Sequence, residues 1–173
     1  MVPIDRALSL GAVILFAAAI STAASTAAKA GPRVVAGVPE VITGDTLKVQ
    51  GLRIRLSGID APEPDQVCLL PHKAYDCGYI AATALMDLTA GTQVDCILGP
   101  PAEDGAVVAV CRADGYDLSE GMTYTGWALA LPGVESRYHN IEARAKEAGR
   151  GLWRGEFVMP WDWRRGERLP AAE

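Results

Sequence analysis

The sequence is short of basic residues and of histidine. Its 173 residues include 16 Lys and Arg, 21 Asp and Glu, and only 2 His, which gives a net charge of −5. Asp5, Arg6 and Lys29 contribute +1 within residues 1–30, which leaves −6 for residues 31–173. This balance argues against a broadly basic surface for nucleic acid, so any basic patch has to be local.

The chain also lacks internal repeats, and it has only one long apolar run. That run is Leu8–Ile20, and Ala28-Lys29-Ala30 after it has the A-x-A form of a cleavage site. The pattern predicts that residues 1–30 are a secretory signal peptide, with an uncleaved N-terminal membrane anchor as the alternative. We therefore expect an exported protein, periplasmic or secreted, in which residues 31–173 form a single monomeric domain.

Four cysteines follow the leader, at Cys68, Cys77, Cys96 and Cys111. An even number beside an export signal indicates two disulfides, for which three pairings exist. We favour Cys68–Cys77 with Cys96–Cys111, because the two strands expected around the latter pair would place their side chains across an antiparallel ladder. A zinc site built from Cys68, His72 and Cys77 is the alternative, but its spacing fits no common ligand pattern.

The hydrophobic pattern predicts strands followed by helices. Strands are expected over 33–42, in a hairpin over 46–59 that turns at Gly51, and over 92–98 and 106–113. Helices are expected over 78–91, 117–130 and 135–149, the second with Asp117 as N-cap and Glu120 three residues on. Residues 61–77 and the C-terminal tail are expected to be irregular or extended. This order favours an α+β domain, a five-stranded OB-fold Greek-key β-barrel with three packed helices.

Three acidic residues flank the predicted hairpin. Asp45, in TGDT, precedes its first strand, and Asp60 and Glu63, in GIDAPE, follow its second. A tight hairpin brings its two ends together, so we expect Asp45 and Asp60 to lie close in space. Close carboxylates repel each other unless a proton or a cation lies between them, and oxygen ligands of this kind suit Ca²⁺ or Mg²⁺.

Arg55 lies on the same hairpin and shares a face with Arg53, because alternate residues of a strand point the same way. Its planar guanidinium matches the geometry of phosphate. A cation, an arginine for phosphate and a third acid to orient water would together form a site for phosphodiester hydrolysis. Each of these residues alone is equally well explained by turn chemistry or a solvated surface, so the hypothesis rests on their combination.

The segments VITGDTLKV, IRLSGIDAPEP, VAVCRADGYDL, GWALA and EARAKEAGRGLW occur in this order within residues 41–153, and the region of resemblance begins at about residue 34. They resemble the thermonuclease family of staphylococcal nuclease-like domains, and the resemblance extends to about residue 163. It implies a five-stranded OB barrel with three helices. It also implies activity on DNA or RNA, with unstacked or single strands preferred.

The resemblance further implies a role for each acid of the hairpin. Asp45 and Asp60 would bind Ca²⁺, with the backbone carbonyl of Ala61 as a further ligand. Glu63 would orient or deprotonate the attacking water. Arg55 would bind the scissile phosphate and stabilise the charge that develops on it.

The sequence departs from the family pattern at two positions. A second arginine, expected just before the last strand, is replaced by Ala106, and a tyrosine expected after GWALA is replaced by Leu131. Loss of one such arginine typically lowers a rate by about 10²–10⁵. Arg53 and Lys73 are candidates to replace it, whereas Arg112 lies about 20 Å further along the strand.

Three hypotheses follow. The first is an exported, Ca²⁺-dependent nuclease with reduced activity. The second is a catalytically inactive OB module that binds single-stranded nucleic acid, Ca²⁺ or a protein partner. It is favoured by Ala106, by Leu131 and by the net charge of −6 on residues 31–173. The acids Glu103 and Asp104, beside Ala106, would also repel phosphate. The third is a structural envelope domain tethered by an uncleaved leader.

Overall fold

The predicted hairpin lies at the centre of the fold. Its strands β3 (Thr46–Val49) and β4 (Leu52–Leu56) pair antiparallel. Gln50 and Gly51 both adopt positive φ angles, 49° and 81°, as the two central residues of a tight hairpin turn do. This turn fixes the register of the two strands, so the start of β3 and the end of β4 lie side by side at the open end of the hairpin.

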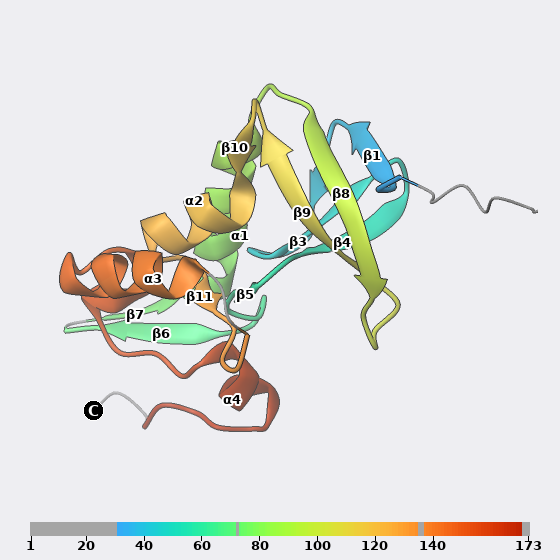
Figure 1. The fold of residues 1–173 in the computed structure, drawn as a ribbon. Helices are drawn as coiled ribbons and strands as arrows, with labels where there is room; N and C mark the ends of the chain where they lie inside the picture. Colours follow the sequence, from blue (N-terminus) through green and yellow to red (C-terminus); the bar gives the residue numbers. More distant parts are fainter. Residues whose placement is uncertain (1–30, 72, 135–136, 171–173) are drawn as a thin grey trace, which may run out of the picture. The chain divides into compact units, whose positions relative to one another are not determined.

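A curled, OB-like sheet surrounds this hairpin (Figure 1). The structure, a computed structural model, describes residues 31–71, 73–134 and 137–170. The strand order is β1-β8-β9-β4-β3-β2, β10 pairs with β9, and only the β4–β9 pairing in this described sheet is parallel. The further strands are β1 (Val34–Gly37), β2 (Glu40–Val41), β8 (Val94–Pro101), β9 (Val107–Ala113) and β10 (Tyr116–Asp117). The α+β prediction is confirmed, and five of these strands have four or more residues.

The three predicted helices are present. They are α1 (Cys77–Thr89), α2 (Leu118–Thr125) and α3 (Tyr138–Glu147). The Asp117 carboxylate accepts the Glu120 backbone N–H at 3.1 Å, which confirms the predicted N-cap. Helix α2 ends earlier than predicted because the chain turns away at the left-handed residue Gly126. It then forms β11 (Leu129–Ala130), which pairs with β5 (Ile59–Asp60).

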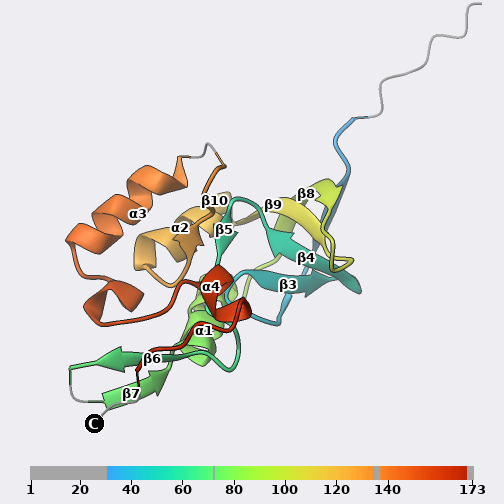
Figure 2. The same ribbon diagram turned by 90° about the horizontal axis from the view of Figure 1, so that it is seen from below.

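Three local predictions are wrong. Pro39 divides the first predicted strand into β1 and β2, since proline cannot donate to a ladder. Residues 61–77, expected to be irregular, contain a separate hairpin of β6 (Val67–Leu70) and β7 (Lys73–Asp76). The tail, expected to be extended, contains the 3₁₀ turn η1 (Gly151–Arg154) and the short helix α4 (Pro160–Arg164). Figure 2 shows α4 close to β5.

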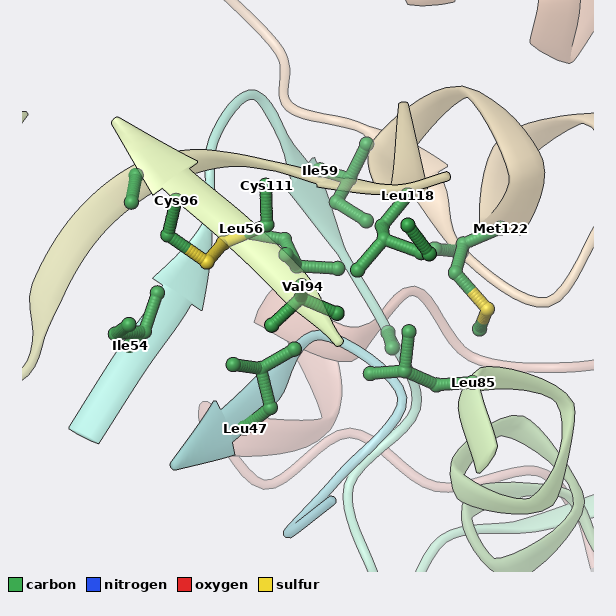
Figure 3. Close-up of a cluster of buried hydrophobic side chains, with 14 of the residues drawn as sticks. Leu47, Ile54, Leu56, Ile59, Leu85, Val94, Cys96, Cys111, Leu118 and Met122 are labelled. Atoms are coloured by element: carbon green, nitrogen blue, oxygen red, sulfur yellow. A yellow bond between two sulfur atoms is a disulfide. The ribbon is translucent and has the colours of Figure 1, made fainter. Parts of the chain in front are cut away.

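Both favoured disulfides are confirmed. Cys96 and Cys111 lie opposite each other on β8 and β9, and their bridge lies in the main core among residues such as Leu56 and Val94 (Figure 3). Cys68–Cys77 joins β6 to the start of α1 within a second buried cluster. These pairings leave no thiolate for zinc, so the alternative zinc site is wrong, and its third candidate, His72, lies outside the described residues.

The predicted leader, residues 1–30, also lies outside the described residues. Within the described part of the chain, no helix is both long enough and apolar enough to cross a membrane.

Candidate functional site

The turn before β3 lies against the end of β5. Asp45 and Asp60 are both largely buried, with 8% and 4% of their surfaces exposed. Asp45 Oδ2 accepts the backbone N–H of Ala61, the residue after Asp60, at 3.4 Å. Asp45 Oδ1 accepts the hydroxyls of Thr43 and Thr46 at 2.7 and 2.8 Å. The hairpin thus brings together the acids that the sequence assigned to a cation.

Arg164, at the end of α4, forms a bidentate ion pair with Asp60. Its Nη1 donates to Asp60 Oδ1 at 3.1 Å and its Nη2 to Asp60 Oδ2 at 2.5 Å. The same Nη1 donates to Glu63 Oε1 at 2.5 Å. We call Asp60, Glu63 and Arg164 the α4 ion cluster. Arg164 was not predicted from the sequence, because 104 residues separate it from Asp60 and no local pattern links them.

Burial sets the electrostatics of this cluster. It raises the pKa of Asp60; the hydrogen bond from Arg164 opposes the rise, and the nearby carboxylate of Asp45 adds to it. The pKa of Arg164 is raised as well, chiefly by its hydrogen bond to Asp60. When Asp45, Asp60 and Glu63 are all ionised, these three carboxylates and the Arg164 guanidinium, which contacts Asp60 and Glu63, carry a net charge of −2.

A second group of charges lies on β4. Arg53 and Arg55 both contact Asp104, in the β8–β9 loop, through Nη2 at 3.4 and 2.8 Å. We call these three residues the β4 ion cluster. The backbone N–H of Ala106, 3.2 Å from Asp104 Oδ1, is the main cause that lowers the pKa of Asp104; burial opposes it, and Arg55 and then Arg53 lower the pKa further. We expected Asp104 to repel phosphate. In the structure it is paired with Arg55, the arginine that we expected to bind phosphate.

Ala106, where the resemblance led us to expect an arginine, is buried. Ala106 has 0% of its surface exposed, so a longer side chain there would have to displace its neighbours. Arg53, one candidate replacement, lies in the β4 ion cluster. In the part of the chain that the structure describes, neither Lys73 nor Arg112 forms an ion pair with either cluster.

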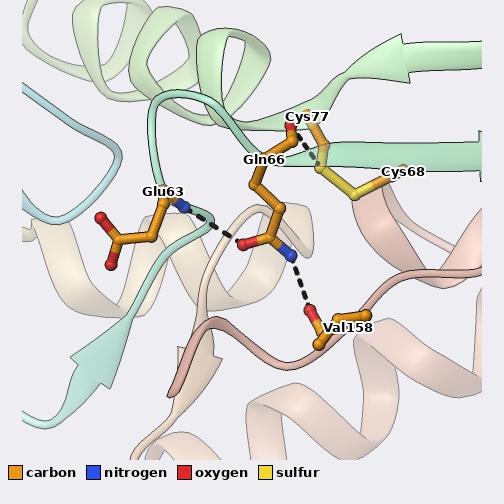
Figure 4. Close-up of a disulfide and its surroundings, with 5 residues drawn as sticks. All are labelled: Glu63, Gln66, Cys68, Cys77 and Val158. Atoms are coloured by element: carbon orange, nitrogen blue, oxygen red, sulfur yellow. Dashed lines mark hydrogen bonds between the residues drawn. A yellow bond between two sulfur atoms is a disulfide. The ribbon is translucent and has the colours of Figure 1, made fainter. Parts of the chain in front are cut away.

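Gln66 joins the Glu63 loop to the C-terminal segment (Figure 4). Its side chain is fully buried; Oε1 accepts the Glu63 backbone N–H at 3.2 Å, and Nε2 donates to the Val158 carbonyl at 2.6 Å. It lies beside the Cys68–Cys77 bridge. Sequence reasoning missed Gln66, because a single glutamine between two prolines and a cysteine gives no sign of such a contact.

The oxygen atoms grouped at the end of β5, which we call the β5 edge, are of the kind that a hard divalent cation prefers. They are the carboxylates of Asp45 and Asp60, with the carbonyl of Ala61 beside them, and oxygen donors suit Ca²⁺. Among the described residues no three His, Cys, Asp or Glu side chains are grouped closely enough to hold a metal ion. Water or substrate oxygens would therefore have to complete the coordination.

The structure thus combines a curled, OB-like sheet with two buried acids beside β5 and an arginine on β4. The sequence model of the family described as staphylococcal nuclease homologue matches residues 53–155. The chain therefore belongs to the staphylococcal nuclease family.

Individual relatives differ in how much of their length is matched. The succinoglycan biosynthesis protein ExoI of Rhizobium meliloti is 35% identical over 70% of this chain and 66% of its own. The probable staphylococcal-like nuclease CAN2 of Oryza sativa is 32% identical over 72% of this chain but only 32% of its own. The micrococcal nuclease of Shigella flexneri is 27% identical over 76% of this chain and 80% of its own. The chain thus spans less than two thirds of the length of the first two.

Proposed function

We propose that this protein is an exported nuclease that hydrolyses phosphodiester bonds of single-stranded DNA or RNA with the help of Ca²⁺. The observation that carries the proposal is the meeting of Asp45, Asp60 and Glu63 at one edge of the sheet that also carries Arg55. The family and the relatives named as nucleases support it.

Each of these residues would have a separate role in phosphodiester hydrolysis. Asp45, Asp60 and the Ala61 carbonyl would hold the cation, which when bound would polarise the scissile phosphate. Arg55 would release Asp104 and bind the phosphate through its guanidinium, stabilising the charge that develops there. Glu63 would orient the attacking water or take its proton, and its carboxylate would have to be shared with Arg164.

Cleavage of fluorescent single-stranded DNA by the oxidised protein, with Ca²⁺ and then with EDTA, tests this proposal. Cleavage that requires Ca²⁺ and is lost in Glu63→Gln is the expected result, because the amide cannot accept a proton. A Glu63→Gln protein that keeps full activity would contradict the assigned mechanism. The substitution leaves the backbone N–H that Gln66 binds in place, so folding is expected to be unaffected.

A second candidate function is a non-catalytic module that binds single strands, Ca²⁺ or a protein partner. The observation that favours it is that both arginines near the site are held by acids, Arg55 by Asp104 and Arg164 by Asp60 and Glu63. Binding of single-stranded DNA with no cleavage at any Ca²⁺ concentration would support this module. Insertion of an arginine at Ala106 is a poor test, since that position is buried.

A further inference from the structure

We propose that Arg164 is a phosphate-binding residue of this site, a second arginine that the C-terminal helix supplies beside Glu63. This inference rests on the proposed function. In the described residues Arg164 is the only base that forms an ion pair with Asp60 or Glu63. A phosphate that reached Glu63 would otherwise meet only negative charge there.

Arg164 retains donors for a ligand. A guanidinium has five N–H groups, and the contacts with Asp60 and Glu63 engage three of them. The Nε–H and the second Nη2–H have no acceptor among residues 31–71, 73–134 and 137–170. The side chain is 46% exposed, so solvent, and hence a substrate, can reach it. A planar fork with two free donors suits two oxygens of one phosphate.

The protein holds this arginine in place from several sides. Before α4, the backbones of Leu69 and Glu156 exchange two hydrogen bonds, at 2.9 and 2.8 Å. Gln66 binds the Val158 carbonyl, and Trp161 of α4 packs on the cluster that contains the Cys68–Cys77 bridge. These contacts fix the start of α4, a helix of only five residues. An arginine that only interacts with solvent would not need its helix to be held in this way.

The neighbouring Arg165 provides an internal contrast. Arg165 directly follows α4; its Nη2 binds Asp162 of that helix, and its side chain is 65% exposed. Helix α4 thus directs Arg164 toward the acids at the β5 edge and leaves Arg165 in a local pair. The two residues are adjacent and carry the same charge, so Arg165→Ala is a matched control for Arg164→Ala.

Charge balance argues against the alternative that Arg164 merely occupies the cation site. Asp45, Asp60 and Glu63 carry three negative charges when ionised, and one arginine together with one divalent cation would neutralise them. Ca²⁺ would have to displace Arg164 from Asp60, whose two oxygens it engages, and Arg164 would remain on Glu63. If Arg164 were only a substitute for the cation, its removal would tighten Ca²⁺ binding and leave the salt dependence of DNA binding unchanged.

The test compares wild type, Arg164→Ala, Arg164→Lys and Arg165→Ala in three measurements. The first is kcat/KM on single-stranded DNA with Ca²⁺, where we expect a loss of about 10²–10³ in Arg164→Ala, partial recovery in Arg164→Lys and little change in Arg165→Ala. The second is binding of labelled single-stranded DNA in EDTA by anisotropy across a salt series. Loss of one phosphate contact should lower the slope of log affinity against log salt by about 0.7. The third is Ca²⁺ affinity by calorimetry, which should rise in Arg164→Ala because Arg164 competes for Asp60, so the salt slope decides whether Arg164 also contacts phosphate.

The outcomes separate this inference from the proposed function. If wild type and Arg164→Ala cleave equally well, the inference is wrong but the proposed function stands. The same holds if Arg165→Ala loses as much activity as Arg164→Ala. Tighter Ca²⁺ binding by Arg164→Ala with an unchanged salt slope would show an occupant of the cation site instead. If wild type does not cleave, the proposed function fails, and the salt slopes still decide whether Arg164 contacts phosphate. Circular dichroism melting of each variant checks that it is folded.

Discussion

The β4 ion cluster and the α4 ion cluster contain the same chemical groups in opposite proportion. In the first, two arginines share the single carboxylate of Asp104; in the second, Asp60 and Glu63 share the single guanidinium of Arg164. With all groups ionised, the first has a net charge of +1 and the second of −1, to which the buried Asp45 adds another negative charge. The difference shows that an acidic chain can still carry a local excess of positive charge; under the proposed function, that excess would receive the phosphate and the acidic group would hold the cation.

The largest effect should come from breaking the β4 ion cluster at Arg55. We expect Arg55→Ala to lower kcat/KM on single-stranded DNA by about 10²–10⁴, because the phosphate would lose its guanidinium in the transition state. Arg53→Ala is the matched control, since Arg53 contacts the same carboxylate at the longer distance of 3.4 Å. Equal losses in both variants would mean that the strand contributes general positive charge and that Arg55 has no special role.

The next effect concerns the acidic edge beside the α4 ion cluster. Asp45→Asn should weaken Ca²⁺ binding by roughly tenfold or more, measured by calorimetry, because an anionic oxygen ligand is lost while the side-chain shape is kept. Asp162→Asn, in α4 but paired with Arg165, removes the same charge away from this edge and should leave the affinity unchanged. Undiminished Ca²⁺ binding by Asp45→Asn would exclude the proposed ligand set.

A steric change can disturb the α4 ion cluster without altering any charge. A Cβ atom at Gly78 would lie 1.8 Å from the Glu63 carbonyl oxygen, so Gly78→Ala has to move the Glu63 backbone or the start of α1. We expect a loss of about 1–3 kcal/mol in the free energy of unfolding, measured in urea, together with reduced cleavage. Tyr79→Ala, at an adjacent side chain that is 70% exposed, should change stability little. A Gly78→Ala protein as stable and active as wild type would mean that this close contact does not position Glu63.

The two clusters also differ in how far the sequence predicts them. Alternation along 46–56 and a turn at Gly51 predict the β3–β4 hairpin, and the hairpin places Asp45 near Asp60 and puts Arg53 and Arg55 on one face. The contact of Arg164 depends on tertiary packing, because α4 has five residues and no periodic pattern. The segment before α4 is held by Gln66, whose side chain donates to the Val158 carbonyl 92 residues away. Local physical rules therefore predict the shared face of Arg53 and Arg55 and the approach of Asp45 to Asp60. They predict neither the pairing of Arg55 with Asp104, 49 residues away, nor the contact of Arg164.

The smallest effect, and the only gain, is expected from releasing Arg55. Asp104→Asn removes the charge that holds both β4 arginines but keeps an oxygen for the Ala106 N–H, so the loop geometry is preserved. We expect kcat/KM to rise roughly twofold to fivefold, mainly through a lower KM, because an exposed ion pair competes only weakly with substrate. The gain should shrink at high salt, which screens the pair in wild type.

Glu103→Gln removes the neighbouring acid of the same loop. If it raises kcat/KM as much as Asp104→Asn does, the gain reflects the charge of the loop and Arg55 is not restrained by Asp104.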